Sequence, residues 1–168
     1  MSEETTHATG IRILRATELP EQAAAHYVRI HGMARQHSIS LREEFDEHDT
    51  PQTQYIVAMD GYQPVATCRL YPYADRCVML GRIVVLPTHR RQGLGSRVVL
   101  EAEKWASEMG YTRAVLDSRE EKVGFYERLG YRINPTLITQ GTFRCIRMEK
   151  DDLSCHGSIQ ADYRAAMR

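Results

Sequence analysis

A basic turn that contains two glycines is the stretch of this chain best suited to chemistry. Residues 89–96 read His-Arg-Arg-Gln-Gly-Leu-Gly-Ser and follow an apolar run that Pro87 ends. Apolar residues then recur every three or four positions, which predicts a helix from about Gly93 to Met109. The first turn of a helix offers unpaired N–H groups and the positive end of the helix dipole. The turn is therefore either a site for an anion such as a pyrophosphate or a purely structural connection.

Two common nucleotide-binding motifs do not fit this turn. The G-x-G-x-x-G fingerprint would need glycine at Val98, and the phosphate loop would need a Gly-Lys pair followed by Ser or Thr. The motif present is R-x-x-G-x-G, from Arg90 to Gly95, directly after Val-Val-Leu-Pro. With Val85 and Pro87 it resembles V-x-P-x-x-R-x-x-G-x-G, the acyl-CoA-binding motif of the GNAT superfamily, the GCN5-related N-acetyltransferases.

A second stretch carries the same resemblance. Residues 124–131 read Gly-Phe-Tyr-Glu-Arg-Leu-Gly-Tyr, which is similar to the F-Y-E-K-L-G-F signature late in the GNAT domain. More weakly, Phe-Asp-Glu-His-Asp at 45–49 and Arg-Leu-Tyr-Pro at 69–72 resemble a segment shared by ElaA-like acetyltransferases and acyl-homoserine lactone synthases. The further upstream aromatic residues usual in the lactone synthases are not found here.

The resemblance implies the GNAT fold, an α/β (α+β) architecture. Its mixed central sheet has antiparallel N-terminal strands, a parallel splayed pair in the middle, and helices on both faces. It also implies an N-acetyltransferase that moves acetyl from acetyl-CoA (coenzyme A) to a primary amine, on a small molecule or a peptide, by direct attack. The residues implied to bind the cofactor are Val84, Val85, Arg90, Arg91, Gln92, Gly93, Leu94, Gly95, Ser96, Lys122 and Phe125. In this set, the backbone near Val84 and Val85 would also receive the oxyanion.

The resemblance assigns the acid more readily than the base. Tyr126 is the candidate general acid, because a phenol with a reference pKa of ~10 can protonate a thiolate whose parent thiol has a pKa of ~8.5; the alternative is a packing residue. Residues 76–87 contain no Asp or Glu, where many family members place a carboxylate. The base is then water or one of Glu44, Asp46 and Asp49. The alternative role for Asp46 and Asp49 is an ion pair with Arg69 that holds a loop to the sheet.

Two other functions stay open. The missing carboxylate would suit a non-catalytic acyl-CoA-binding sensor, and the weaker resemblance would suit a lactone-synthase-like acyltransferase. The Asn that usually precedes the F-Y signature is also replaced, near Arg119.

The surrounding pattern supplies the elements that would position these residues. Strands are expected over 11–16, 54–60, 63–71, 76–86, 112–117, from 131, and over 142–149, with a hairpin turn at Asp60-Gly61. Ala23, Tyr27, Ile30 and Ala34 predict the buried face of a helix that starts near Pro20. Ser118 and Glu121 predict a capping box before a helix over 122–129. Residues 37–54 are predicted to be polar and irregular.

Length and composition narrow the class. The 168 residues suit one domain over 11–150, between a disordered tail at 1–10 and a polar tail at 151–168. The balance of 22 basic and 22 acidic residues argues against nucleic acid as a partner, and no apolar run reaches the ~20 residues that would span a membrane. Without a hydrophobic leader, the chain is expected to be cytoplasmic. A homodimer stays open.

The cysteines and histidines show no metal-binding or disulfide pattern. The four cysteines form no C-x-x-C pair, and the histidines have no ligand spacing. We therefore expect no metal and no structural disulfide, with Cys68 and Cys77 as buried free thiols.

Overall fold

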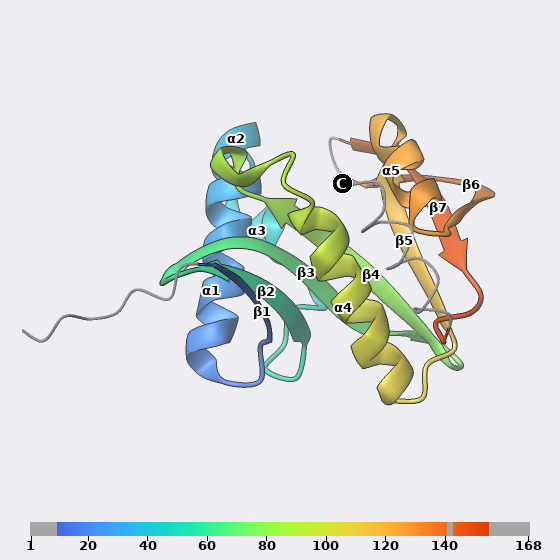
Figure 1. Cartoon of the computed structure of the whole chain (residues 1–168). Helices are drawn as coiled ribbons and strands as arrows, with labels where there is room; N and C mark the ends of the chain where they lie inside the picture. Colours follow the sequence, from blue (N-terminus) through green and yellow to red (C-terminus); the bar gives the residue numbers. More distant parts are fainter. Residues whose placement is uncertain (1–9, 141–142, 155–168) are drawn as a thin grey trace, which may run out of the picture.

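The computed structural model of the chain describes residues 10–140 and 143–154, which form a single sheet with helices packed against it (Figure 1). The strands are β1 (Ile11–Arg15), β2 (Gln54–Asp60), β3 (Gln63–Ala74), β4 (Cys77–Val85), β5 (Arg113–Arg119), β6 (Arg132–Gln140) and β7 (Phe143–Lys150). The α-helices are α1 (Leu19–Arg29), α2 (Arg35–His37), α3 (Leu41–Glu44), α4 (Leu94–Glu108) and α5 (Val123–Arg128). A π-helical turn at Ile30–Ala34 joins α1 to α2, and 3-10 turns at Pro87–His89 and Glu120–Lys122 precede α4 and α5.

The sheet has the strand order β1-β2-β3-β4-β5-β7-β6. Strands β1 to β4 form an antiparallel meander, whereas β4 and β5 run parallel and are joined by the α4 crossover. The parallel pairing covers only Cys77–Leu80 against Arg113–Leu116, although β4 continues to Val85 and β5 to Arg119. The two strands therefore separate at their carboxyl ends, which confirms the predicted fold and its splayed pair.

Helices cover both faces of this sheet (Figure 1). On one face, α4 buries Val98, Ala102 and Ala106 in the main core, together with Cys68 and Leu70 of β3. On the other face, Val28 of α1 packs against Val84 and Leu86, and Ala25 packs against Tyr55. Burial of these apolar side chains is the main source of stability. The carboxyl end of β4 is thereby held between the two layers.

The predicted buried face of the first helix is wrong at Ala23 and Tyr27 and confirmed at Ala34. Ala23 and Tyr27 are exposed, and the buried residues are Ala25, Val28, Arg29, Gly32 and Ala34. Two of the buried positions, Arg29 and Gly32, are not apolar, so a search for apolar spacing could not find them. The π-helical turn also breaks the regular 3.6-residue period on which such a search depends.

The predicted capping box at Ser118 is also wrong. Ser118 lies inside β5, is buried, and donates its hydroxyl to the carbonyl of Arg119 at 2.8 Å. Strand β5 continues because its residues pair with β7 as far as Arg119. A true capping box closes the first turn of α3 instead, between Ser40 and Glu43, within the segment predicted to be irregular.

Most of the remaining boundaries follow the sequence. Helix α4 begins and ends within one residue of its prediction, and Gly110 and Gly130 have the positive φ of helix C-terminal caps. Strand β3 runs three residues past its predicted end, to Ala74. Leu153, assigned to the polar tail, is buried in the main core. The predictions for residues 1–9, 142 and 155–168 lie outside the described residues.

Two further expectations concern the cysteines and the possibility of a membrane-spanning helix. Cys68, Cys77 and Cys145 are free and buried. No helix among the described residues is both long and apolar enough to cross a membrane.

Candidate functional site

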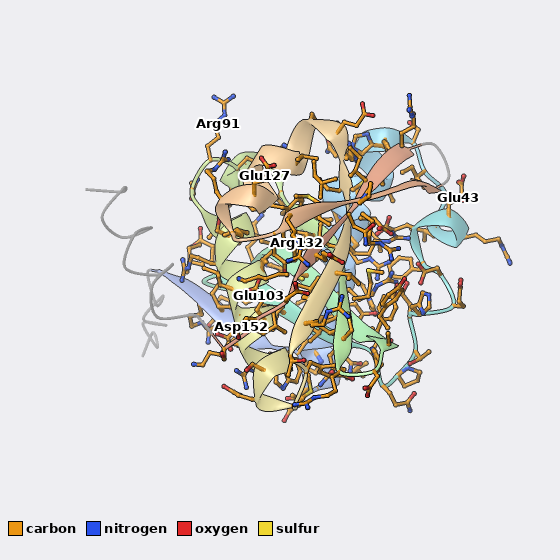
Figure 2. All side chains as sticks on the ribbon, turned by 90° about the vertical axis from the view of Figure 1, so that its right-hand side faces the viewer. Glu43, Arg91, Glu103, Glu127, Arg132 and Asp152 are labelled. Carbon is orange, nitrogen blue, oxygen red and sulfur yellow. The ribbon has the colours of Figure 1, made fainter. Side chains whose placement is uncertain are left out.

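The basic turn connects β4 to the N-terminus of α4. Arg91 and Gly93 both adopt positive φ, at 61° and 75°, and Gly93 caps the helix. The side chains of Leu94 and Ser96 are buried, so this turn presents backbone N–H groups outward rather than these side chains. Arg91 points away from the body of the protein into solvent (Figure 2). The turn therefore combines an open helix N-terminus with a free cationic side chain.

Gly95 brings this turn against α5. A Cβ at Gly95 would lie 3.3 Å from Cζ of Phe125, closer than most real Cβ contacts. Phe125 is partly buried against the main core beside Val85. The two sequence signatures, far apart in the chain, thus meet at one place in the fold.

The edge of β4 that faces β5 is the next part of the site. The N–H of Leu86 donates to the carbonyl of Val65 in β3 at 2.9 Å. Because the backbone groups of successive strand residues point to opposite sides, those of Val84 also face β3, whereas those of Ile83 and Val85 face β5. Consistently, the carbonyl of Val85 accepts from Nε of Arg90 at 3.2 Å. The sequence analysis named Val84 and Val85, and of these two Val85 directs its N–H to the gap between the strands. Ile83, which the sequence analysis did not name, directs its N–H to the same gap.

A bulge explains why β4 leaves β5. The register against β3 shifts between Thr67 and Arg69, and Arg82 on β4 has a φ of 47°, unusual for a residue with a side chain. Such bulges bend a strand and increase its twist. Arg82 is held in this conformation by hydrogen bonds to the carbonyl of Glu44 at 3.1 Å and to Oδ2 of Asp46 at 3.2 Å.

Tyr126 lies on α5 and is buried in the main core. Its ring packs edge-on against Phe125 and Tyr131, and the residue is 9% exposed. Burial, reinforced by the nearby thiols of Cys68 and Cys145, raises the pKa of Tyr126 well above its ordinary value. Those thiols come from β3 and β7, the strands on either side of the β4–β5 pair. A phenol at this place stays protonated at neutral pH and can donate a hydrogen bond or a proton.

The three carboxylates named from the sequence are all bound by arginines. Arg29, fully buried, donates to Glu44 at 2.8 Å and to Asp49 at 2.5 Å. Arg69 donates to Asp46 at 2.7 Å and to Asp49 at 2.8 Å, so the predicted ion pair between this arginine and the loop is confirmed.

These contacts make two of the carboxylates weak bases. Burial alone would raise the pKa of Asp49, but hydrogen bonds from Arg29 and Tyr55 outweigh it and lower that pKa far below its usual range. Burial opposes the shift at Asp46 as well, and Arg69 lowers its pKa. The cluster suits the positioning of the segment after α3 better than the removal of a proton.

Asp117 is a carboxylate that the sequence analysis did not single out. It lies on β5 one residue past the last pairing with β4, and Arg147 of β7 donates to both of its oxygens. Together with Gly81 and Arg69 it lines a small cavity at the point where the strands part. A lone acidic residue at the end of an otherwise buried parallel strand is the signal that could have identified it.

The remaining named residues lie around α5. Lys122 is exposed in the 3-10 turn before this helix. Arg119, in place of the usual Asn, lies 3.9 Å above the ring of Phe143 and close to His37. Among residues 10–140 and 143–154, no group of three or more His, Cys, Asp or Glu could hold a metal ion.

Comparison with known proteins gives a consistent result. The sequence model of the acetyltransferase (GNAT) family matches residues 12–131. The chain is 33% identical over 109 residues to YjcF of Bacillus subtilis, an uncharacterised N-acetyltransferase, and the match covers 65% of this chain and 76% of that protein. A crystal structure from Lactobacillus plantarum, provisionally named an N-acetyltransferase, has a TM-score of 0.79 at 29% identity, over 84% of this chain and 98% of that one. Escherichia coli ElaA shares the fold, with a TM-score of 0.69 at 17% identity over 84% and 98% of the two chains.

Proposed function

Because this chain belongs to the acetyltransferase (GNAT) family, we propose that it transfers an acetyl group from acetyl-CoA directly to a primary amine. The supporting observation is the separation of β4 and β5 after Leu80 and Leu116, beside the basic glycine turn. This gap exposes a strand edge to which the amides of a pantetheine arm can bind as an added strand would. Tyr126 lies on α5, the helix that contacts Gly95 of the turn through Phe125.

In this proposal the turn and the strand edge bind different parts of the cofactor. The backbone N–H groups of Arg91 to Ser96 bind the pyrophosphate at the N-terminus of α4, and Arg91 adds charge from solvent. The exposed backbone of Val85 binds the pantetheine arm, which displaces Arg90 from the carbonyl of Val85 and frees its guanidinium for a phosphate. Phe125 and Lys122 border the cofactor site on the side of α5.

The reaction is a single acyl transfer. The lone pair of the amine attacks the thioester carbonyl carbon, and the oxyanion accepts a hydrogen bond from the N–H of Ile83 or Val85. The C–S bond then breaks, and Tyr126 gives its proton to the departing thiolate and regains one from solvent. The amine loses its proton to water, because Asp46 and Asp49 have lowered pKa values and are held by arginines. In this proposal Glu44, Asp46 and Asp49 anchor the β4 bulge.

A thiol-release assay tests this function. Acetyl-CoA is incubated with a panel of amino acids, polyamines, aminoglycosides and lysine peptides, with the wild type and with Tyr126→Phe. We expect turnover with at least one amine, a kcat lower by about 10²–10⁴-fold in Tyr126→Phe, and an unchanged affinity for CoA. Tyr62→Phe, on the exposed β2–β3 turn, is the matched control and should keep full activity. CoA binding without turnover on any amine would instead favour the sensor.

A further inference from the structure

A cavity of about 60 Å³ lies where β4 and β5 begin to separate. Arg69 of β3 pairs directly with Gly81 of β4, and Asp117 of β5 would come next if the register of Leu80 and Leu116 continued. Three neighbouring strands thus place an arginine, a glycine and an aspartate side by side. A Cβ built on Gly81 meets no atom within 4 Å, so the missing side chain leaves open space between the two charged residues.

This cavity opens on the face of the sheet opposite α4. Cys68 and Leu70 point into the α4 core, and Arg69 between them extends to Asp46 and Asp49 after α3. Tyr71 and Met79, which pair two residues further along the two strands, lie on the same face. An acceptor on this side would approach the gap from the face that α4 and the main core do not occupy.

The Nε of Arg69 is a buried hydrogen-bond donor without a partner in the described part of the chain. The side chain is 3% exposed, and its two terminal nitrogens donate to Asp46 and Asp49 over 2.7–3.1 Å. Its Nε has no acceptor among the described residues. Buried donors are nearly always paired, and the two aspartates fix the plane of this guanidinium so that Nε cannot turn to another partner. The Nε–H of Arg69 is therefore available to an oxygen atom of a ligand.

We propose that the cavity is an acceptor subsite, in which Nε–H of Arg69 donates to an oxygen atom carried by the amine substrate close to its nitrogen. This inference rests on the proposed function. The gap begins at Gly81, and Ile83, whose N–H faces β5, is two residues further along the chain, at most about 7 Å away. The oxygen and the reacting nitrogen are therefore a few bonds apart, as in amino acids, amino-acid amides, peptide N-termini and amino alcohols. Polyamines and simple alkylamines lack such an oxygen.

Matched amines test the subsite directly. Alanine, alaninamide and 2-aminopropanol carry a carboxylate, a carbonyl and a hydroxyl on one skeleton, and isopropylamine is the same skeleton without oxygen. With acetyl-CoA, and with rates expressed per unprotonated amine, we expect kcat/KM at least 10-fold higher for one or more of the first three. The amine with the highest kcat/KM identifies whether the oxygen is a carboxylate, a carbonyl or a hydroxyl oxygen. Equal values for all four would overturn the subsite while leaving the transferase function standing.

A cavity-filling variant supplies the second test. Gly81→Ala adds a methyl group to the open space and leaves the ion pairs of Arg69 intact. We expect kcat/KM for the preferred oxygen-bearing amine to fall at least 10-fold, toward that of isopropylamine, with a smaller fall for isopropylamine itself and with the CoA affinity and the unfolding midpoint unchanged. An equal loss for all amines would contradict the proposal.

A binding measurement decides the case without turnover. In the CoA-saturated protein, the assigned ¹H–¹⁵N signal of Arg69 Nε should shift on addition of the oxygen-bearing amines and not of isopropylamine. If no amine is acetylated, the proposed function fails, and this signal still decides the subsite. An unmoved signal, or the same shift with isopropylamine, would overturn it.

Discussion

At the residue scale, the site is held by a network of arginines and carboxylates. Arg29 and Arg69 share Asp49, Tyr55 donates to the same carboxylate at 2.7 Å, and Arg82 joins through Asp46. Breaking a largely buried ion pair leaves an uncompensated charge, which costs far more than the loss of a surface pair. The segment after α3 is therefore fixed to the strand bulge that opens the gap.

Asp49→Asn tests this network through its pH dependence. The pKa of Asp49 is lower in the folded state than in the unfolded chain, where it is ~3.9. The stability from this group is therefore fully present above about pH 5 and is lost as pH falls below 4. We expect Asn to cost about 3–5 kcal/mol at pH 7, from urea unfolding. Below pH 4 the wild type should lose stability more steeply than the variant, and parallel curves would contradict the assignment.

At the element scale, the sequence predicted those helix and strand boundaries that depend on neighbouring residues. Helix α4 could be predicted almost to the residue because its apolar spacing and its flanking glycines are properties of adjacent positions. The burial of Arg29 could not be predicted in this way, because its partners Glu44 and Asp49 come from a segment 15–20 residues later. The cavity beside Gly81 depends on the register of three strands, which no single segment encodes. Asp117 does have a local signal, its place at the end of a buried strand, but its position beside Gly81 depends on that register.

The turn before α4 can be tested with two glycines that both have positive φ. Gly93, with a φ of 75°, begins the helix, and Gly110, with a φ of 95°, follows its end. Alanine at either position should cost about 1–2 kcal/mol, because L-residues with a Cβ disfavour this conformation. Only Gly93→Ala should raise the KM for acetyl-CoA, since only that end binds the pyrophosphate in our proposal.

Asparagine provides the control for backbone strain at the same position. It adopts positive φ more readily than most residues. Gly93→Asn should therefore retain most of the stability and most of the acetyl-CoA affinity that Gly93→Ala loses. An equal rise in KM for Gly93→Ala and Gly110→Ala would mean that the turn has no special role in cofactor binding.

At the scale of the whole molecule, the gap divides the sheet into two parts. In the described part of the chain, the β1–β4 meander and the β5–β7–β6 group pair through a short parallel ladder of four residue pairs, and Arg147 of β7 donates to Tyr73 of β3. A buried polar cluster adds a further connection: Lys150 of β7 donates to Glu103 of α4 at 2.7 Å and to the carbonyl of Leu129 at 2.9 Å. Tyr131 donates to Glu103 at 2.7 Å. Glu103 lies inside the protein, between α4 and the second part of the sheet (Figure 2).

This cluster should therefore contribute strongly to stability. Lys150→Met leaves the fully buried Glu103 without its cation, and we expect a loss of about 3–5 kcal/mol in urea unfolding at pH 7. The double variant Lys150→Met with Glu103→Leu removes both charges and should recover most of that loss. Lys104→Met, on the exposed side of the same helix, should change stability by less than about 0.5 kcal/mol. If the double variant is no more stable than Lys150→Met, the loss comes from packing, and the ion pair does not hold the two parts of the sheet together across the gap.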